Sequence, residues 1–324
     1  MVKVIRFHKP GGPEVLTWED VETPPLSPNE IRIRHTVIGL NFIDTYHRSG
    51  LYPLPLPSGL GMEAAGIVEA LGHNVTDLAV GDRVAYASPP PGAYSEERVI
   101  DANNVVSIPS QISDDTAAAV MLKGLTAQYL LRQIHKVGPS DTILIHAAAG
   151  GVGLLVCQWA KSLGATVIGT VGNEEKAGLA KANGCDFPII YTRDDFLDRV
   201  LEITSGEKVP VVFDSIGKDT FEKSLDCLKP LGKMVSFGQA SGPIPPVDLG
   251  VFAQKGSLTF TRPTLFHYAN SKESLAAMAE DLFKVIVSNQ VTVRIDQRFP
   301  LKEARAAHEA LEARSTTAST ILIP

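Results

Sequence analysis

Four polar side chains lie close together in the stretch GLNFIDTYHRSGLY (39–52): Asn41, Asp44, Tyr46 and Tyr52. An amide, a carboxylate and two phenols can orient a ligand by hydrogen bonding, but only the carboxylate is a common zinc ligand. The stretch therefore raises the question of whether it binds a metal or acts without one. Each residue also has a structural alternative, since the first two can cap a turn or helix and the tyrosines can be core aromatics with satisfied hydroxyls.

A glycine-rich turn forms the second candidate site. The predicted strand DTILIHA leads into Ala148-Ala149-Gly150-Gly151-Val152-Gly153, and apolar residues at helical spacing follow. Glycines at this point let backbone N–H groups at a helix N-terminus approach a pyrophosphate. The turn therefore predicts dinucleotide binding, and the alternative is a tight βα turn that binds nothing.

The residues that follow the second strand of this βαβ unit favour NADPH over NADH. NADH enzymes usually place an acidic residue there to accept from the ribose hydroxyls, but this chain has Gly172 and Asn173. The small residue leaves room for a 2′-phosphate, which Lys176 and Tyr191 are placed to contact. Glutamates at 174–175 weaken this prediction, and Lys176 taken alone is more typical of a solvated charge on a helix.

The pattern of elements predicts an α/β protein with two domains. Short β-patterned runs with Gly and Pro turns fill the first 120 residues, and strands alternate with amphipathic helices from about residue 123. That pattern ends near 264, and a long helix around 272–288 precedes further β-patterned segments. We expect a β-rich domain at 1–122, completed by 265–324, and a doubly wound parallel-sheet domain at 123–264.

Composition excludes several classes of protein. The net charge is −6, the basic residues are scattered, and no stretch approaches 18 apolar residues, so nucleic-acid and membrane partners are not expected. The N-terminus begins with a strand pattern instead of the apolar segment of a signal peptide, which predicts a cytoplasmic protein. Cys157, Cys185 and Cys227 lack metal spacing, and we expect buried thiols in preference to a disulfide or metal set.

Several motifs together resemble the quinone oxidoreductases of the medium-chain dehydrogenase/reductase superfamily, the zeta-crystallin relatives. They are GLNFIDTYHRSGLY, GMEAAGIVEALGHNVTDLAVGDRVA (61–85), HAAAGGVGLL (146–155) and DSIGKDTF (214–221). The chain is most similar to the bacterial NADPH:quinone reductases. The resemblance implies a GroES-like catalytic domain, a Rossmann domain, NADPH in the cleft between them, and a homodimer.

The same comparison answers the metal question. The positions that match the zinc ligands of zinc-dependent members are Asn41, Met62, and either Leu122 or Lys123. An amide, a thioether and an aliphatic or ammonium group do not form a catalytic zinc site. The cysteine-rich structural zinc lobe is also missing after Tyr86, so we expect no metal.

The resemblance assigns roles to individual residues. Asn41, Tyr46 and Tyr52 line the substrate side, Asp44 lies near the nicotinamide ribose, and Arg262 offers a cation to an electron-rich intermediate. We expect His47 to be exposed and Glu63 to be a structural carboxylate. The residues expected against NADPH are Phe42, Thr126, Tyr129, Gly150, Gly151, Val152, Gly153, Gly172, Lys176, Tyr191, Ser215, Phe237, Gly238 and Arg314.

The expected activity is zinc-free, NADPH-dependent reduction of a small-molecule quinone. A quinone needs no Lewis acid, because the negative charge of its reduced form is delocalised, whereas alcohol oxidation needs a strong charge stabiliser. An enone or alkenal reductase is the alternative enzyme. An RNA-binding or structural crystallin-like protein is the alternative from another class, and the charge of −6 counts against RNA.

Overall fold

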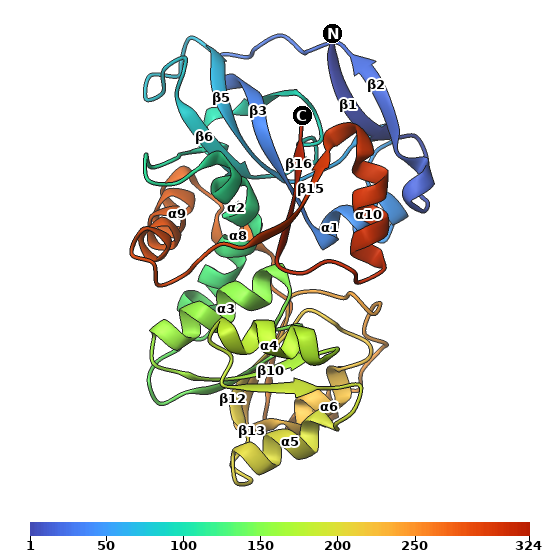
Figure 1. Cartoon of the computed structure of the whole chain (residues 1–324), viewed down its shortest axis with the longest axis vertical. Coiled ribbons are helices and arrows are strands. Elements are labelled where there is room, and N and C mark those ends of the chain that lie inside the picture. Colours follow the sequence, from blue (N-terminus) through green and yellow to red (C-terminus); the bar gives the residue numbers. More distant parts are fainter. The chain divides into compact units, whose positions relative to one another are not determined.

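The computed structural model describes all residues from 1 to 324. The chain divides into two compact units (Figure 1). The first comprises Met1–Leu125, Tyr268–Val287 and Val293–Pro324, and the second comprises Thr126–His267 and Ser288–Thr292. Residues 288–292, which were expected in the first domain with the rest of 265–324, group with the second unit.

A seven-stranded sheet forms the centre of the first unit. Its longest strand alternates buried and more exposed positions, with Ile31 and Ile33 fully covered, as expected for a sheet with one face on the core. The C-terminal strand pairs antiparallel with this strand, so the end of the chain completes the N-terminal sheet. The spatial order is β15 (Ile295–Pro300), β16 (Ser319–Ile323), β3 (Glu30–Leu40), β5 (Glu63–Leu71), β6 (Arg83–Ala87) and β8 (Val106–Ser107), with β7 (Glu97–Asp101) paired to β3.

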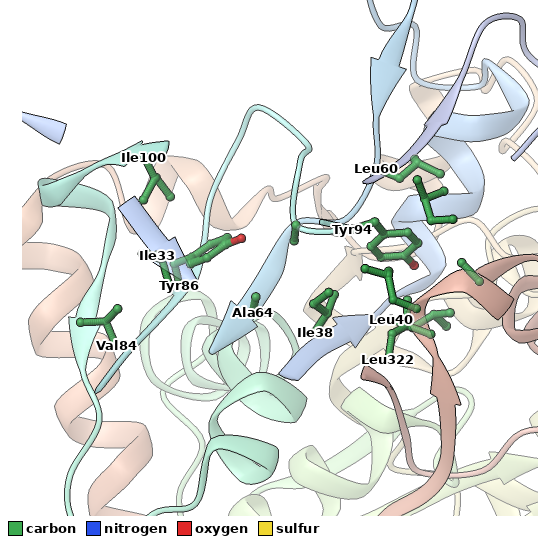
Figure 2. Packing of buried hydrophobic residues seen from close by; sticks show 14 of the residues in the cluster. Ile33, Ile38, Leu40, Leu60, Ala64, Val84, Tyr86, Tyr94, Ile100 and Leu322 are labelled. Carbon is green, nitrogen blue, oxygen red and sulfur yellow. The ribbon is translucent and has the colours of Figure 1, made fainter. Parts of the chain in front are cut away.

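A smaller sheet and several helices complete this unit. Isoleucine, leucine and valine side chains from β3, β5, β6 and β16 pack around Tyr86 and Tyr94 (Figure 2). The three-stranded sheet has the order β2 (Thr17–Val21), β1 (Val2–Phe7) and β4 (Ser58–Gly59). The helices are η1 (Pro13–Val15), α1 (Phe42–Ser49), η2 (Ala102–Asn104), α9 (Lys272–Val287), η4 (Leu301–Glu303) and α10 (Ala304–Glu312).

Helix α2 (Asp114–Gln128) begins earlier than the sequence pattern suggested. We expected helix from the segment TAQYLLRQIH, which is the end of α2 and the following π-helical turn η3 (Tyr129–Ile134). Residues 117–121 are all fully covered. Because this part of the helix is buried on every side, it lacks the alternation of apolar and polar faces that identifies a surface helix.

The second unit is a doubly wound parallel sheet, which confirms the predicted fold class. Numbered from β9, its strands follow the 3-2-1-4-5-6 order of dinucleotide-binding folds, and all pairs are parallel. The spatial order is β11 (Phe187–Ile190), β10 (Thr166–Val171), β9 (Thr142–Ile145), β12 (Val209–Asp214), β13 (Leu228–Ser236) and β14 (Thr259–Thr261). The helices are α3 (Gly151–Ser162), α4 (Glu174–Ala182), α5 (Phe196–Ile203), α6 (Phe221–Asp226), α7 (Gly250–Gln254) and α8 (Leu265–Tyr268).

The three cysteines are buried and free, which confirms the expectation of buried thiols. None of the helices combines the length and the apolar character needed to cross a bilayer.

Candidate functional site

The first candidate site begins where strand β3 ends and helix α1 starts. Asn41 is the N-cap residue of α1, and its backbone N–H donates to Oδ2 of Asp44 at 2.9 Å. This bond satisfies one of the backbone donors at the helix start and fixes the Asp44 carboxylate against it. Asn41 therefore has the capping role considered as its alternative, whereas Asp44 is the N3 residue of the capping box and not an N-cap.

The amide side chain of Asn41 donates away from its helix, to the carboxylate of Glu63. Asn41 Nδ2 lies 2.9 Å from Glu63 Oε1, and Lys123 Nζ lies 2.8 Å from the same oxygen. Glu63 Oε2 accepts from the backbone N–H of Leu122. Glu63 is fully covered, so its charge is held entirely by these three donors.

Gly39 is required for the carboxylate to lie in this position. A Cβ at residue 39 would lie 2.2 Å from Glu63 Oε1 and 2.3 Å from the carbonyl oxygen of Ala118. Neither group has room to move away, since one is in the buried ion pair and the other is backbone. Any larger side chain would displace Glu63 from its three donors.

The residues at the matched zinc positions do not fit a zinc ion. Of the two candidates for the third ligand position, the side chain of Lys123 is the one that meets Asn41 at Glu63. Met62 is buried. An ammonium and an amide N–H donate hydrogen bonds to the carboxylate, and neither group can coordinate a cation while doing so.

Asp44 also belongs to a buried polar network that the sequence did not reveal. Its Oδ2 accepts from the hydroxyl of Tyr94 at 3.0 Å, and that hydroxyl lies 3.1 Å from Nε2 of His308. His308 Nδ1 lies 2.9 Å from an Arg48 nitrogen, and Arg48 also pairs with Glu312 at 2.5 Å. These residues are far apart in the chain and carry no shared motif.

Burial dominates the titration of this network. It raises the pKa of Asp44 to about 7, with Glu63 adding a smaller increase. Burial, assisted by the positive charge of Arg48, lowers the pKa of His308 to about 3. The second carboxylate oxygen of Asp44 is covered and has no hydrogen-bond partner, which adds to the cost of ionising this side chain.

The expectation that His47 is exposed is wrong. Only 7% of the residue is accessible, and burial lowers its pKa to about 4. Most of α1 is buried, and so the short helix does not have the solvent face that its polar sequence suggests. The ring of His47 lies 6.0 Å from that of Tyr52.

The two predicted substrate tyrosines form an aromatic cluster. Their rings meet edge to face at 5.3 Å, and the backbone N–H of Tyr52 donates to the carbonyl of Tyr46 at 3.0 Å. The ring of Phe42 lies 5.8 Å from that of Tyr46. The structure thus brings these side chains together, and their contacts with substrate or cofactor remain predictions.

The glycine-rich turn in the second unit has the geometry of a phosphate-binding turn. Gly150 is the N-cap of α3, whose first turn contains Gly151, Val152 and Gly153. A Cβ on Gly153 would lie 2.2 Å from the carbonyl oxygen of Ala147, so glycine is needed for the helix to pack this closely on the strand. The free N–H groups of the first helical turn can then bind an anion.

At the end of strand β10, Gly172 lies close against Tyr191. The nearest atom to a Cβ built on Gly172 would be the hydroxyl of Tyr191, at 3.2 Å, so these two predicted residues are neighbours. Asn173 caps α4 by accepting from the backbone N–H of Lys176 at 2.9 Å. Lys176 therefore lies in the first turn of α4, as the prediction requires.

An arginine near this position was missed. Arg193 donates to Glu174 at 2.7 Å and also pairs with Asp194. The pair with Glu174 partly neutralises the glutamate charge that weakened the NADPH prediction. Arg193 follows Tyr191 by only two residues. Its position just after the end of strand β11 is the sequence signal that could have identified it.

Arg262 binds backbone groups in the second unit. Its guanidinium donates to the carbonyl oxygens of Ser236, at 2.9 Å, and Gly238, at 2.8 Å. It thereby fixes the loop after β13, where Phe237 also donates through its backbone to Asp214 at 2.7 Å. The proposed role of Arg262 toward an intermediate is a prediction, and its structural role is to hold this loop.

The remaining predicted cofactor residues lie in both units. Ser215 adjoins Gly238, since a Cβ on that glycine would lie 2.6 Å from the serine carbonyl oxygen. Thr126 and Tyr129 are nearly covered. Arg314 follows α10 in the first unit and Lys176 belongs to the second, so their joint contact with a phosphate stays a prediction.

Comparisons with known proteins agree with this description. The chain matches the models for an alcohol dehydrogenase GroES-like domain over residues 27–110 and for a zinc-binding dehydrogenase over 151–284. It is 56% identical to a quinone oxidoreductase of Pseudomonas aeruginosa, covering all of both chains. It is 47% identical to a 2-haloacrylate reductase of a Burkholderia species, covering 100% of this chain and 99% of that one. The crystal structure of Escherichia coli quinone oxidoreductase complexed with NADPH is 50% identical, covering 99% of this chain and 100% of that one, with a TM-score of 0.98.

Proposed function

Because the chain belongs to the quinone oxidoreductases of the medium-chain dehydrogenase/reductase superfamily, we propose that it reduces quinones with NADPH and without zinc. It is an oxidoreductase, and its cofactor is NADPH. The observation that carries the zinc-free mechanism is the pairing of Lys123 and Asn41 with one oxygen of Glu63. A buried ammonium lies among the residues that match the zinc ligands.

The residues present fit the cofactor. The first turn of α3 offers backbone donors to a pyrophosphate, and Gly172 adjoins the Tyr191 hydroxyl at the strand end where a 2′-phosphate is expected. When bound, NADPH supplies a hydride. We propose that the cofactor lies in the cleft between the two domains, with the cluster around Asn41 on the substrate side.

Metal analysis tests the zinc-free part of this proposal. The purified protein is expected to hold far less than one zinc per chain and to keep its quinone reductase activity after dialysis against a chelator. About one tightly held zinc per chain, with activity that depends on it, would contradict the proposal.

A substrate panel tests the activity itself. Consumption of NADPH and of NADH is measured with a simple benzoquinone, a polycyclic quinone and an alkenal, and an alcohol is tested with the oxidised cofactor. Quinone-dependent loss of NADPH, with little activity toward NADH, is the expected result. Turnover of the alkenal alone would favour the second candidate, an enone reductase, which the likeness to a 2-haloacrylate reductase supports.

A homodimer is also proposed. Strand β14 is at the edge of the parallel sheet, where one side of a strand has no neighbour in the chain, and such an edge can pair with a second copy across a two-fold axis. Sedimentation equilibrium is expected to give twice the chain mass of 34.7 kDa. A single-chain mass at micromolar concentration would contradict it.

A further inference from the structure

We propose that the Lys123 ammonium performs the electrostatic task of the metal: it donates a hydrogen bond to the quinone oxygen that gains negative charge during reduction. This inference rests on the proposed quinone reductase function. It adds a catalytic residue at one of the two positions, 122 and 123, that the resemblance matches to the third ligand of zinc-dependent relatives.

The first step of the argument is the unequal burial of the ion pair. Glu63 is 0% exposed, and both of its oxygens have donors. The side chain of Lys123 is 8% exposed, and Glu63 is its partner. An ammonium has three N–H donors, and Glu63 accepts one of them. Hydrogen-bonding capacity therefore remains on the cation, whereas the anion is fully covered.

The second step is the fixed orientation of the cation. The short side-chain amide of Asn41 and the backbone N–H of Leu122 hold the Glu63 carboxylate from two directions, while Gly39 provides the space it occupies. A carboxylate held this rigidly positions the Lys123 ammonium without reorganisation when charge develops on a ligand. Preorganised donors of this kind stabilise oxyanions far better than water does.

The third step is the chemistry that needs such a donor. A quinone that accepts a hydride gains two electrons and one proton, and becomes a hydroquinone monoanion. One proton from water then completes the hydroquinone. Lys123 keeps its own proton throughout, because its task is to hydrogen-bond the anionic oxygen between these two events.

Three variants separate this role from charge balance. Lys123→Met removes the ammonium but leaves the Glu63 carboxylate buried and unpaired, which can prevent folding. Glu63→Gln keeps Lys123 and removes its anchor. The double variant Lys123→Met with Glu63→Gln removes both charges and retains one side-chain oxygen, which can accept from the backbone N–H of Leu122. It is therefore the decisive protein.

The measurements are the NADPH dissociation constant, kcat/KM with a simple benzoquinone, and the binding of 4-nitrophenol. 4-Nitrophenolate resembles the hydroquinone monoanion, and its absorbance reports its ionisation. The double variant is expected to bind NADPH as the wild type does and to lose about 100-fold in kcat/KM, the typical effect of one oxyanion donor. The wild type is expected to bind 4-nitrophenolate in preference to neutral 4-nitrophenol, and the double variant is expected to lose this preference. Glu63→Gln is expected to retain part of that preference.

Two results would overturn the proposal. One is a double variant with quinone turnover close to that of the wild type, which would make Lys123 a counter-ion for Glu63 only. The other is a parallel loss of NADPH affinity and turnover, which would make the pair structural. If the wild type reduces no quinone, the proposed function fails by itself, and the 4-nitrophenol measurement still decides whether Lys123 stabilises an oxyanion.

Discussion

Arg48 donates a hydrogen bond of 2.9 Å to Nδ1 of His308. Because a guanidinium has no acceptor, this bond requires a lone pair on Nδ1 and places the proton of the neutral ring on Nε2. His308 then donates to the hydroxyl of Tyr94, which in turn donates to Asp44. The donors in this buried chain all point toward the carboxylate of the predicted active-site helix.

The first prediction concerns acid stability. The pKa of His308 falls from 6.5 to about 3 in the folded protein, so the unfolded chain binds the proton first as the pH falls below 6.5. Stability should therefore fall between pH 6.5 and about 3, by about 1.4 kcal/mol per unit of pKa shift. The variant His308→Gln can accept from Arg48 and donate to Tyr94. In urea unfolding it should lose less free energy of unfolding between pH 6.5 and about 3 than the wild type, whereas His73→Gln at an exposed site should lose as much as the wild type.

The second prediction has the opposite sign. The pKa of Asp44 rises from 3.8 to about 7 on folding, so the folded protein keeps this proton longer than the unfolded chain. Its contribution to stability is complete below pH 3.8 and is lost as the pH rises through about 7. Asp44→Asn should stay neutral, so its melting temperature should change less with pH between pH 4 and 8 than that of the wild type. If its melting temperature depends on pH as strongly as that of the exposed control Asp219→Asn, ionisation of Asp44 is not the cause of the pH dependence.

The third prediction compares two glycines in the second unit. Gly153→Ala places a Cβ 2.2 Å from a backbone oxygen and should cost about 1–3 kcal/mol of unfolding free energy, with loss of NADPH binding. Gly178→Ala lies in helix α4 with no atom within 4 Å of the new Cβ and should add about 0.5–1 kcal/mol. Thermal unfolding and NADPH titration of both variants check the contrast, and equal effects would argue against close packing at Gly153.

The fourth prediction concerns cofactor choice. Lys176→Ala should reduce the preference for NADPH over NADH by about 1–3 kcal/mol, the value of a charge-assisted contact. The control is Lys181→Ala, near the other end of the same helix. The measured quantity is the ratio of kcat/KM for the two cofactors, and a ratio equal to that of the wild type would exclude Lys176 from the phosphate site.

Local patterns in the sequence determined much of this protein. The alternation of strands and helices predicted the parallel sheet, because each such element has its own apolar period. The glycines at 150–153 predicted the turn at the start of α3, since their spacing reflects a backbone requirement that no other residue meets. The resemblance to zinc-dependent relatives placed residues 41, 62 and 122 or 123 at the ligand positions, and their side-chain types predicted a site without zinc ligands.

The tertiary structure decided which distant groups meet. The sequence left Leu122 and Lys123 as equal candidates, and only the fold placed the ammonium on Glu63. Nor did any pattern link Asp44 to Tyr94, 50 residues further along the chain, or Tyr94 to His308, another 214 residues further. Hydrogen bonds across such separations leave no periodic signal in the sequence. Burial shifts the pKa of each group, and burial is decided by the packing of the whole interior and not by the residue type.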